Sequence, residues 1–217
     1  MSRPPLTQNE HTDVRYAARA SYDRDLAYSI IDEATVAHVG LVDRDRPVVI
    51  PMLHARIEDH LYLHGSPATR LFRSAKRGLD VCVTITLIDG LVLARSAFHH
   101  SANYRSVVLF GQSVPVSSVE ERRKILDAYV DKVVPGRRQH LRAMSDKEVR
   151  GTAMFSLPIE EASVKMRHGG PVDEPEDYDL PIWAGVLPTS SGYESPIPDP
   201  LNQPGLDAPA HVVEMTR

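Results

Sequence analysis

The sequence predicts a mainly β fold with a few helices, in which short antiparallel strands form a closed or half-closed barrel. Between residues 36 and 64, β-rich apolar runs recur about every 12 residues and are separated by turn-forming residues. Asp89-Gly90 is a typical hairpin dipeptide between two further β-rich runs. Few segments have helical spacing, and a barrel leaves few strand edges open to aggregation.

Composition limits the possible functions. The 217 residues, 42% of them hydrophobic and 25% charged, are typical of one globular domain with an ordinary core. The net charge of −4 argues against nucleic-acid binding. No apolar run approaches the roughly 18 residues of a membrane span, and the polar N-terminus does not resemble a signal peptide. We therefore expect a cytoplasmic protein that binds neither nucleic acid nor membranes.

The first half of the chain begins with an arm over residues 1–20, followed by one folded domain over 21–168. A helix is predicted within 21–35, because Ser21 or Asp23 can cap it and its apolar residues share one face. Strands are expected next, and a short helix follows them; their ranges are 36–42, 48–55, 61–64 and 66–76.

The second half of the domain is mostly β. The stretch from 80 to 98 is expected to fold as a hairpin at Asp89-Gly90, and a strand is expected over 105–116. The clearest helix follows, because Ser117 or Ser118 can cap it and Pro135-Gly136 ends it. One further helical turn and two strands complete the domain, at 146–150, 153–157 and 162–166.

A proline-rich tail is predicted over residues 169–217. Its composition cannot support a regular element over SSGYESPIPDPLNQPG. Trp183, the only tryptophan, is expected to be an anchor that docks this tail on the barrel or on a partner subunit.

The ten histidines do not predict a metal site. His99 and His100 are adjacent, so on a strand their side chains point to opposite faces and cannot chelate one ion. His54, His60 and His64 lack the spacing of known zinc motifs. Haem ligation stays open, because one histidine suffices. The single Cys82 lies in VCVTIT and is expected to be a buried, unreactive thiol.

Two polar segments favour an anionic ligand, since the sequence contains no GxSxG, GxGxxG or Walker motif. In LYLHGSPATR, a predicted strand is followed by Gly65, Ser66 and Arg70, which can cradle a phosphate at the start of a helix. The alternative is a serine-capped surface helix with a solvated basic face. Tyr104-Arg105-Ser106 begins another strand and supplies a second guanidinium, although it can equally be a polar strand start.

Several segments in order carry a family resemblance: VAHVGLVDRDRPVVIPM, LYLHGSPATR, DGLVLARSAFHHSANYRSVVLFGQ, VVPGRR, VKMRHGGP and WAGVLP. Over about residues 20–190, the chain resembles the flavin-nucleotide-binding branch of the pyridoxamine 5′-phosphate oxidase-like split β-barrels, related to the nitroimidazole-resistance flavoproteins. The resemblance implies a six-stranded antiparallel Greek-key split barrel. It also implies a homodimer with FMN at the subunit interface.

The resemblance also implies cofactor-binding residues. Main-chain contacts along the isoalloxazine edge are expected from Val49, Ile50, Pro51 and Met52. The segment around the ribityl phosphate comprises Leu63, His64, Gly65, Ser66 and Arg70. The motif that closes on the flavin, from the same or the other subunit, comprises Asn103, Tyr104, Arg105 and Ser106.

The implied function is an FMN-dependent oxidoreductase that passes hydride or electrons from a nicotinamide donor to a small acceptor, such as a nitro compound or a quinone. The vitamin B6 oxidase reaction is not implied, because Arg70 is followed by Leu71 instead of lysine. No catalytic side chain is assigned. The alternatives are a non-catalytic flavin-storage protein, a deazaflavin enzyme, or a haem protein that uses His64 or His100.

Overall fold

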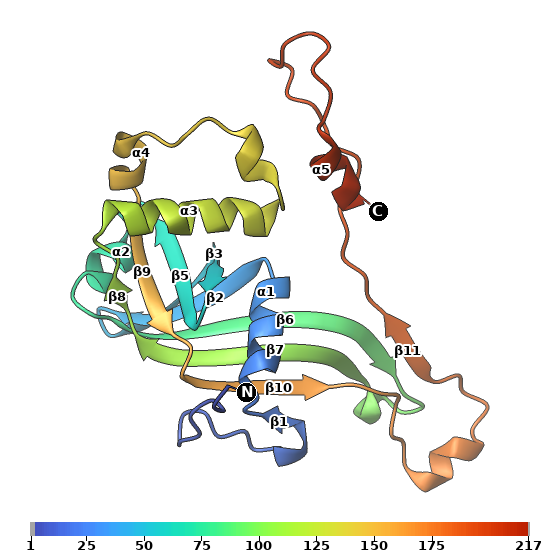
Figure 1. Cartoon of the computed structure of the whole chain (residues 1–217). Coiled ribbons are helices and arrows are strands. Elements are labelled where there is room, and N and C mark those ends of the chain that lie inside the picture. The colour runs from blue at the N-terminus through green and yellow to red at the C-terminus, as the bar shows by residue number, and fades with distance from the viewer. Residues whose placement is uncertain (1–2, 217) are drawn as a thin grey trace.

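The computed structural model describes residues 3–216 and is built mainly from two antiparallel sheets (Figure 1). The larger sheet has the strand order β1-β10-β7-β6-β2-β3, and β11 also pairs with β6. Its strands are β1 (Ala20–Ser21), β2 (Val36–Asp43), β3 (Arg46–Leu53), β6 (Asp80–Leu93), β7 (Ser101–Gln112), β10 (Glu161–Arg167) and β11 (Gly185–Pro188). The smaller sheet has the order β4-β5-β9-β8, with β4 (Ala55–Ile57), β5 (His60–Gly65), β8 (Val114–Pro115) and β9 (Ala153–Pro158).

The chain passes between the two sheets four times, once through α2 between β5 and β6 and three times at short corners. These corners lie at His54 between β3 and β4, at Ser113 between β7 and β8, and at residues 159–160 between β9 and β10. The Ser113 hydroxyl fixes its corner, because it accepts a bond from the Leu79 N–H (2.8 Å) and donates to the Ala75 carbonyl (3.1 Å). The sheets hold seven and four strands, more than the six that the resemblance implied, partly because they include two-residue strands such as β1 and β8.

The helices pack against these sheets. α1 contacts β4, β6, β7 and β10, and α3 lies across the smaller sheet above β5 and β9 in Figure 1. Asp23 caps α1 by accepting from the Leu26 N–H (3.0 Å), and Ser118 caps α3, as two of the predicted caps required. The helices are α1 (Arg24–Glu33), α2 (Arg70–Ala75), α3 (Val119–Val133), α4 (Asp146–Gly151) and α5 (Ala210–Val213).

Two hydrophobic clusters form the interior. The larger one joins α1 and α2 to both sheets, with Phe155 among its largest fully buried side chains. The smaller one lies beneath α3 and contains Ala55, Val116, Ile125, Tyr129 and Met154. The apolar face of α3 therefore serves two purposes: part of it is core, and the rest faces a pocket described below.

Arg24 is a buried structural arginine, only 5% exposed. Its guanidinium donates to the carbonyl of Pro4 (2.9 Å) in the N-terminal arm and to the carbonyl of Ile159 (2.5 Å) at a sheet corner. It also pairs with the Glu160 carboxylate at 2.8 Å. One side chain thus joins the arm, α1 and the β9–β10 corner.

The hairpin predicted at Asp89-Gly90 is wrong. β6 runs unbroken from Asp80 to Leu93, and its register to β7 shifts between Ile88 and Gly90, which marks a β-bulge. The glycine is needed for close approach and not for a turn: a Cβ there would lie 2.9 Å from the carbonyl oxygen of Leu187 on β11. The chain reverses later instead, through the short 3-10 helix Ala97–His99.

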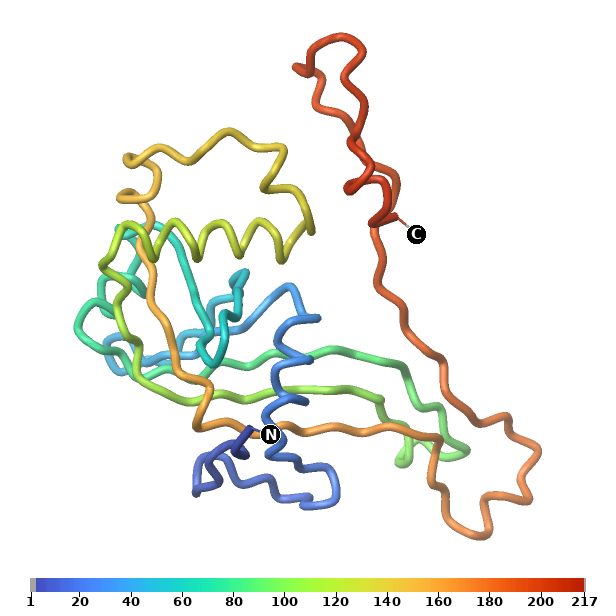
Figure 2. The backbone as a smooth tube through the Cα atoms, viewed as in Figure 1, coloured from blue at the N-terminus to red at the C-terminus, as the bar shows by residue number. Residues whose placement is uncertain are grey.

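The C-terminal tail leaves the body along the outer half of β6, where β11 pairs with residues 90–93 (Figure 2). An Arg95–Asp173 ion pair (3.0 Å) holds the start of the tail, with the Asp173 carboxylate fully buried. Trp183 is 70% exposed, so it is not buried against the body of its own chain. Its ring lies over Gly185, where a Cβ would be 2.9 Å from the indole. Residues 189–209 contain no helix or strand, as predicted.

Candidate functional site

A first pocket lies along the edge strand β3 and is called here the strand pocket. It has a volume of about 310 Å³, within the range of small-ligand sites. β3 is the terminal strand of the larger sheet, so one side of its backbone has no strand partner among residues 3–216. The pocket is lined by Ile50, Pro51, Met52, Leu53, His64, Gly65, Ser66, Thr69, Leu71 and Phe72.

A second pocket, the helix pocket, lies between α3 and the smaller sheet. Its volume is about 360 Å³ and its wall is almost entirely apolar. Arg137 is the only charged side chain in the lining, and it forms no ion pair with any residue in the described part of the chain. The pocket is lined by Leu53, His64, Leu126, Tyr129, Val130, Val133, Val134, Arg137 and Met144.

His64 and Leu53 line both pockets, so the two cavities meet at these residues. Along β5, side chains alternate between faces, which buries Leu63 in the core and turns His64 toward the pockets. Nδ1 of His64 is buried and has no hydrogen-bond partner among residues 3–216. Burial lowers the pKa of His64, so the ring is neutral at physiological pH. A neutral imidazole is the form that binds a metal ion.

Tyr129 fixes the orientation of His64. The two rings meet edge to face with centroids 4.2 Å apart. The Tyr129 hydroxyl donates to the backbone carbonyls of Leu53 and Tyr62, which ties α3 to both sheets. Burial raises the pKa of Tyr129, so the phenol stays protonated. The tyrosine therefore acts as a positioning residue for the imidazole.

Gly65 allows the strand pocket to form its inner wall. A Cβ at this position would lie 2.5 Å from the ring of Phe72, which is a core residue of α2. The aromatic ring consequently packs directly on the backbone where β5 ends. The group that approaches the Gly65 backbone is therefore a side chain of the same chain.

Six of the thirteen residues proposed from the sequence line the strand pocket: Ile50, Pro51, Met52, His64, Gly65 and Ser66. Val49 is 63% exposed and does not line the pocket, although it shares a face of β3 with Pro51 and Leu53. Arg70 is exposed at the start of α2, and its guanidinium is 3.3 Å from the Asp43 carboxylate. Arg70 is therefore near the pocket but already has an anionic partner.

The four residues from Asn103 to Ser106 lie within β7 and do not line either pocket. Arg105 is held by two carboxylates, Asp89 (2.7 Å) and Glu33 (2.5 Å). These carboxylates raise the pKa of Arg105, so it stays charged. Two other side chains of the motif also bind within the chain: Asn103 donates to the Gly169 carbonyl and Ser106 to the Lys165 carbonyl. Three of its four side chains therefore have partners in the same chain.

Sequence reasoning did not identify the helix pocket. The apolar residues of α3 divide between two environments: Ile125 and Tyr129 belong to the smaller core, whereas Val130 and Val133 line the pocket. The available signal was that the apolar residues continue past the end of the helix to Val134, shortly before the charged Arg137.

Lys132 and His54 form a second polar pair that the sequence did not reveal. Nζ of Lys132 lies 2.7 Å from Nε2 of His54 and 2.8 Å from the carbonyl of Ile31 at the end of α1. Burial and the nearby ammonium lower the pKa of His54 to about 4, and burial lowers the pKa of Lys132 to about 8. The pair joins α1 to α3 behind the helix pocket.

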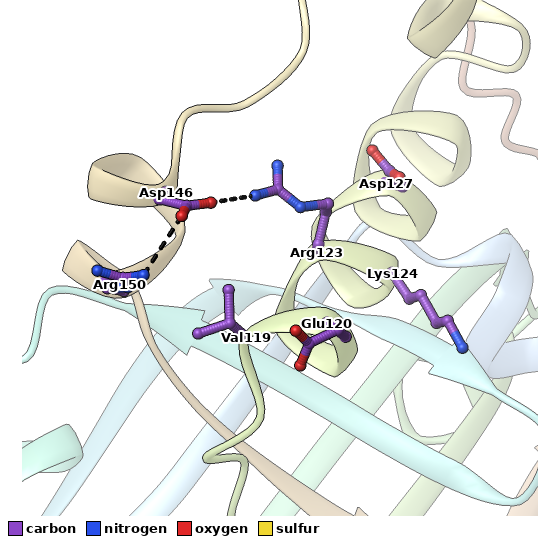
Figure 3. Close-up of a pocket in the computed structure, with 7 residues that line it drawn as sticks. All are labelled: Val119, Glu120, Arg123, Lys124, Asp127, Asp146 and Arg150. Atoms are coloured by element: carbon purple, nitrogen blue, oxygen red, sulfur yellow. Dashed lines mark hydrogen bonds and ion pairs between the residues drawn. The ribbon is translucent and has the colours of Figure 1, made fainter.

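A separate surface cleft between α3 and α4 has charged walls (Figure 3). Asp146 accepts from Arg123 (2.8 Å) and from Arg150 (3.3 Å). The ion pair between Arg123 and Asp146 holds α4 against α3. Within residues 3–216, no three His, Cys, Asp or Glu side chains are grouped so that they could hold a metal ion.

The fold and the paired pockets define a class of protein, namely a two-sheet antiparallel β protein with a ligand-sized cleft along a strand edge. The family model for pyridoxamine 5′-phosphate oxidase matches residues 23–166. The chain therefore belongs to the pyridoxamine 5′-phosphate oxidase family. A comparison with curated protein sequences finds no match.

Solved structures refine this assignment. The flavocytochrome Anf3 from Azotobacter vinelandii is 40% identical, with a TM-score of 0.90 over 97% of this chain and 99% of that chain. The FAD and haem binding protein from Mycobacterium smegmatis is 35% identical, with a TM-score of 0.87 over 91% and 97% of the two chains. A Bacteroides thetaiotaomicron protein described as a 5-nitroimidazole antibiotic resistance protein is 26% identical, with a TM-score of 0.57 over 67% and 85%.

Proposed function

We propose that this protein is a flavocytochrome-type redox protein that holds a flavin in the strand pocket and a haem in the helix pocket. The observation that carries the proposal is the pair of pockets that meet at His64 and Leu53. The two relatives at 40% and 35% identity support it, because one is described as a flavocytochrome and the other as an FAD and haem binding protein.

The strand pocket fits a flavin. The unpartnered edge of β3 offers backbone N–H and C=O groups to the polar edge of a ring system, and Phe72 and Leu71 supply an apolar wall. Arg70 lies beside the pocket and suits a phosphate. We propose FAD in place of the FMN implied by the family resemblance, because the relative at 35% identity is described as binding FAD. A bound flavin would supply hydride and single-electron chemistry.

The helix pocket fits a haem. His64 presents a neutral imidazole with a buried, unpartnered Nδ1, and the surrounding valines and leucines exclude water. Arg137 stands at the rim with its guanidinium free of ion pairs in the described chain, which suits a carboxylate of the ligand. In this proposal the His64 imidazole would ligate the iron, and Tyr129 would fix the orientation of the His64 ring.

The proposed activity is electron transfer from a reduced nicotinamide donor to a small acceptor such as a quinone or nitro compound. Protein purified without added cofactors should show flavin absorbance together with a Soret band. Mass analysis of the released flavin then distinguishes FAD from FMN. A colourless protein that takes up neither flavin nor haemin would refute the proposal, and a flavin that NADH and NADPH fail to reduce would favour storage.

We also propose a homodimer. Large apolar side chains are exposed on β3 and along the tail, including Val49, Leu53, Trp183, Ile197 and Leu201. Apolar exposure over two separate regions favours burial against a second copy of the chain. Light scattering coupled to size exclusion should therefore give twice the chain mass, and a monomeric mass would contradict the proposal.

Arg70→Ala should weaken flavin binding about tenfold. A lost hydrogen bond from a charged donor costs about 1.5 kcal/mol at the lower end of its usual range, which applies because this side chain is more than half exposed. The measurement is the dissociation constant from flavin fluorescence quenching.

Asp43→Asn is the matched control, because it removes the partner of Arg70 and leaves the guanidinium in place. Its flavin affinity should equal or exceed that of the wild type. If Arg70→Ala leaves the affinity unchanged, the phosphate binds elsewhere.

A further inference from the structure

The C-terminal end of the chain returns to the body at the rim of the helix pocket. This segment, called here the strap, comprises α5 and the 3-10 helix Glu214–Thr216. Its His211 ring stacks on His140, with centroids 4.3 Å apart and planes inclined by 20°. His140 ends the short 3-10 helix η3 (Arg137–His140), which begins with the arginine of the pocket rim.

The backbone at the rim is shaped for this contact. Gly136 adopts a left-handed conformation with φ of 78°, which favours glycine. A Cβ on Gly136 would lie 3.8 Å from the Cβ of His211, so the strap rests directly on this turn. The strap therefore covers the same short segment that follows the pocket-lining residues Val133 and Val134.

The irregular segment 189–209, which precedes the strap, is long enough for the strap to undock. Residues 189–209 contain no helix or strand and are mostly exposed. An extended chain of this length spans up to roughly 70 Å, so the strap can undock while β11 stays paired with β6. Docking depends mainly on the local contact at η3.

The charged groups around His211 disfavour protonation of its ring. Arg137 and His140 face it from η3, whereas Glu214 on the strap is the carboxylate that acts in the other direction. Arg138 is turned away and pairs with Asp127 at 3.3 Å. Nε2 of His211 is buried without a hydrogen-bond partner among residues 3–216, so a protonated ring would bury an unsatisfied donor.

We propose that the strap docks on the rim of the helix pocket in a pH-dependent way, bound while His211 is neutral and released when His211 gains a proton. The inference goes beyond the proposed function, because it concerns the rim segment and holds whichever ligand occupies the pocket. Release exposes the rim from Gly136 to His140.

The pH direction follows from linkage. Burial, His140 and Arg137 lower the pKa of docked His211 below its ordinary value of 6.5. The undocked state therefore takes up a proton first as the pH falls. Docking is at full strength well above pH 6.5 and weakens progressively below it.

Hydrogen exchange followed by mass spectrometry tests the proposal on the full chain, with rates corrected for intrinsic pH dependence. In the wild type, peptides covering 134–141 and 208–216 should lose protection several-fold between pH 8 and the lowest pH at which β6 and β7 stay protected. His211→Phe keeps a flat ring without a charge and should stay protected throughout. His168→Phe, which replaces an exposed histidine directly after β10, should behave as the wild type does.

Three results would overturn the proposal. The first is wild-type protection that does not change with pH, and the second is an absence of protection at pH 8. The third is a His211→Phe variant that loses protection as the wild type does, because the charge on His211 would then not be the trigger. The 208–216 peptide contains no residue that lines either pocket, so its exchange and the spectral test of the proposed function fail independently.

Discussion

His64→Leu is expected to yield a protein that keeps its flavin absorbance and loses its Soret band. Leucine preserves the apolar volume at the junction of the two pockets and removes both ring nitrogens. Loss of a residue that only supports a metal ligand costs about 10–100-fold in affinity, so loss of the ligand itself should exceed about 100-fold. Haemin titration of the cofactor-free protein, followed by its Soret absorbance, measures the change.

Two histidines serve as matched controls. His60 lies on the same strand and pairs with Asp59 at the surface, and His100 binds the Ser96 carbonyl in the turn before β7. His60→Leu and His100→Leu should bind haemin as the wild type does. Soret absorbance that persists in His64→Leu and disappears in His100→Leu would place the ligand at the other histidine that the sequence offered.

Arg24→Leu is expected to lower the free energy of unfolding by about 2–4 kcal/mol. The variant leaves the buried carbonyl of Ile159 without its donor, which costs about 1–3 kcal/mol, and it also removes the bond to the part-buried carbonyl of Pro4. The melting temperature should fall by about 5–15 °C for a chain of this size. Circular dichroism during chemical and thermal unfolding measures both quantities.

The control for this variant is Arg15→Leu. Arg15 is exposed and lies over the Tyr16 ring at 5.7 Å, so its removal should change the stability by less than about 0.5 kcal/mol. Equal losses in the two variants would show that the buried arginine does not hold the arm to the β9–β10 corner.

Elements with strong local signals were predicted well from the sequence. α1 and α3 begin at the predicted caps Asp23 and Ser118, and the turn at residues 43–45 forms with positive φ at Arg44 and Asp45. Asp89-Gly90 failed because its local preference for a turn is overridden by tertiary structure. Arg105 on β7 forms ion pairs with both Asp89 and Glu33. The backbone of β11, which lies 95 residues further along the chain, packs against Gly90 in the space that a side chain would fill.

The candidate site was predicted in part, because short continuous segments are easier to read from a sequence than contacts between distant ones. The strand pocket is lined mainly by two such segments, one on β3 and the other beginning at His64. The helix pocket combines β5 with α3 and Met144, and periodicity alone does not distinguish a helix face that meets core from one that meets a cavity. Asn103–Ser106 stay a prediction, because the contacts of a second subunit determine whether they approach a flavin.

The packing of the Trp183 ring over Gly185 has a practical consequence for spectroscopy. Since this exposed indole is the only tryptophan, its emission reports the tail and is nearly silent about the core. Unfolding curves recorded by tryptophan fluorescence would therefore underestimate cooperativity in this protein. The same property makes Trp183 an intrinsic probe of the tail. A shift of its emission to shorter wavelength as the protein concentration rises would show that another surface covers the tail.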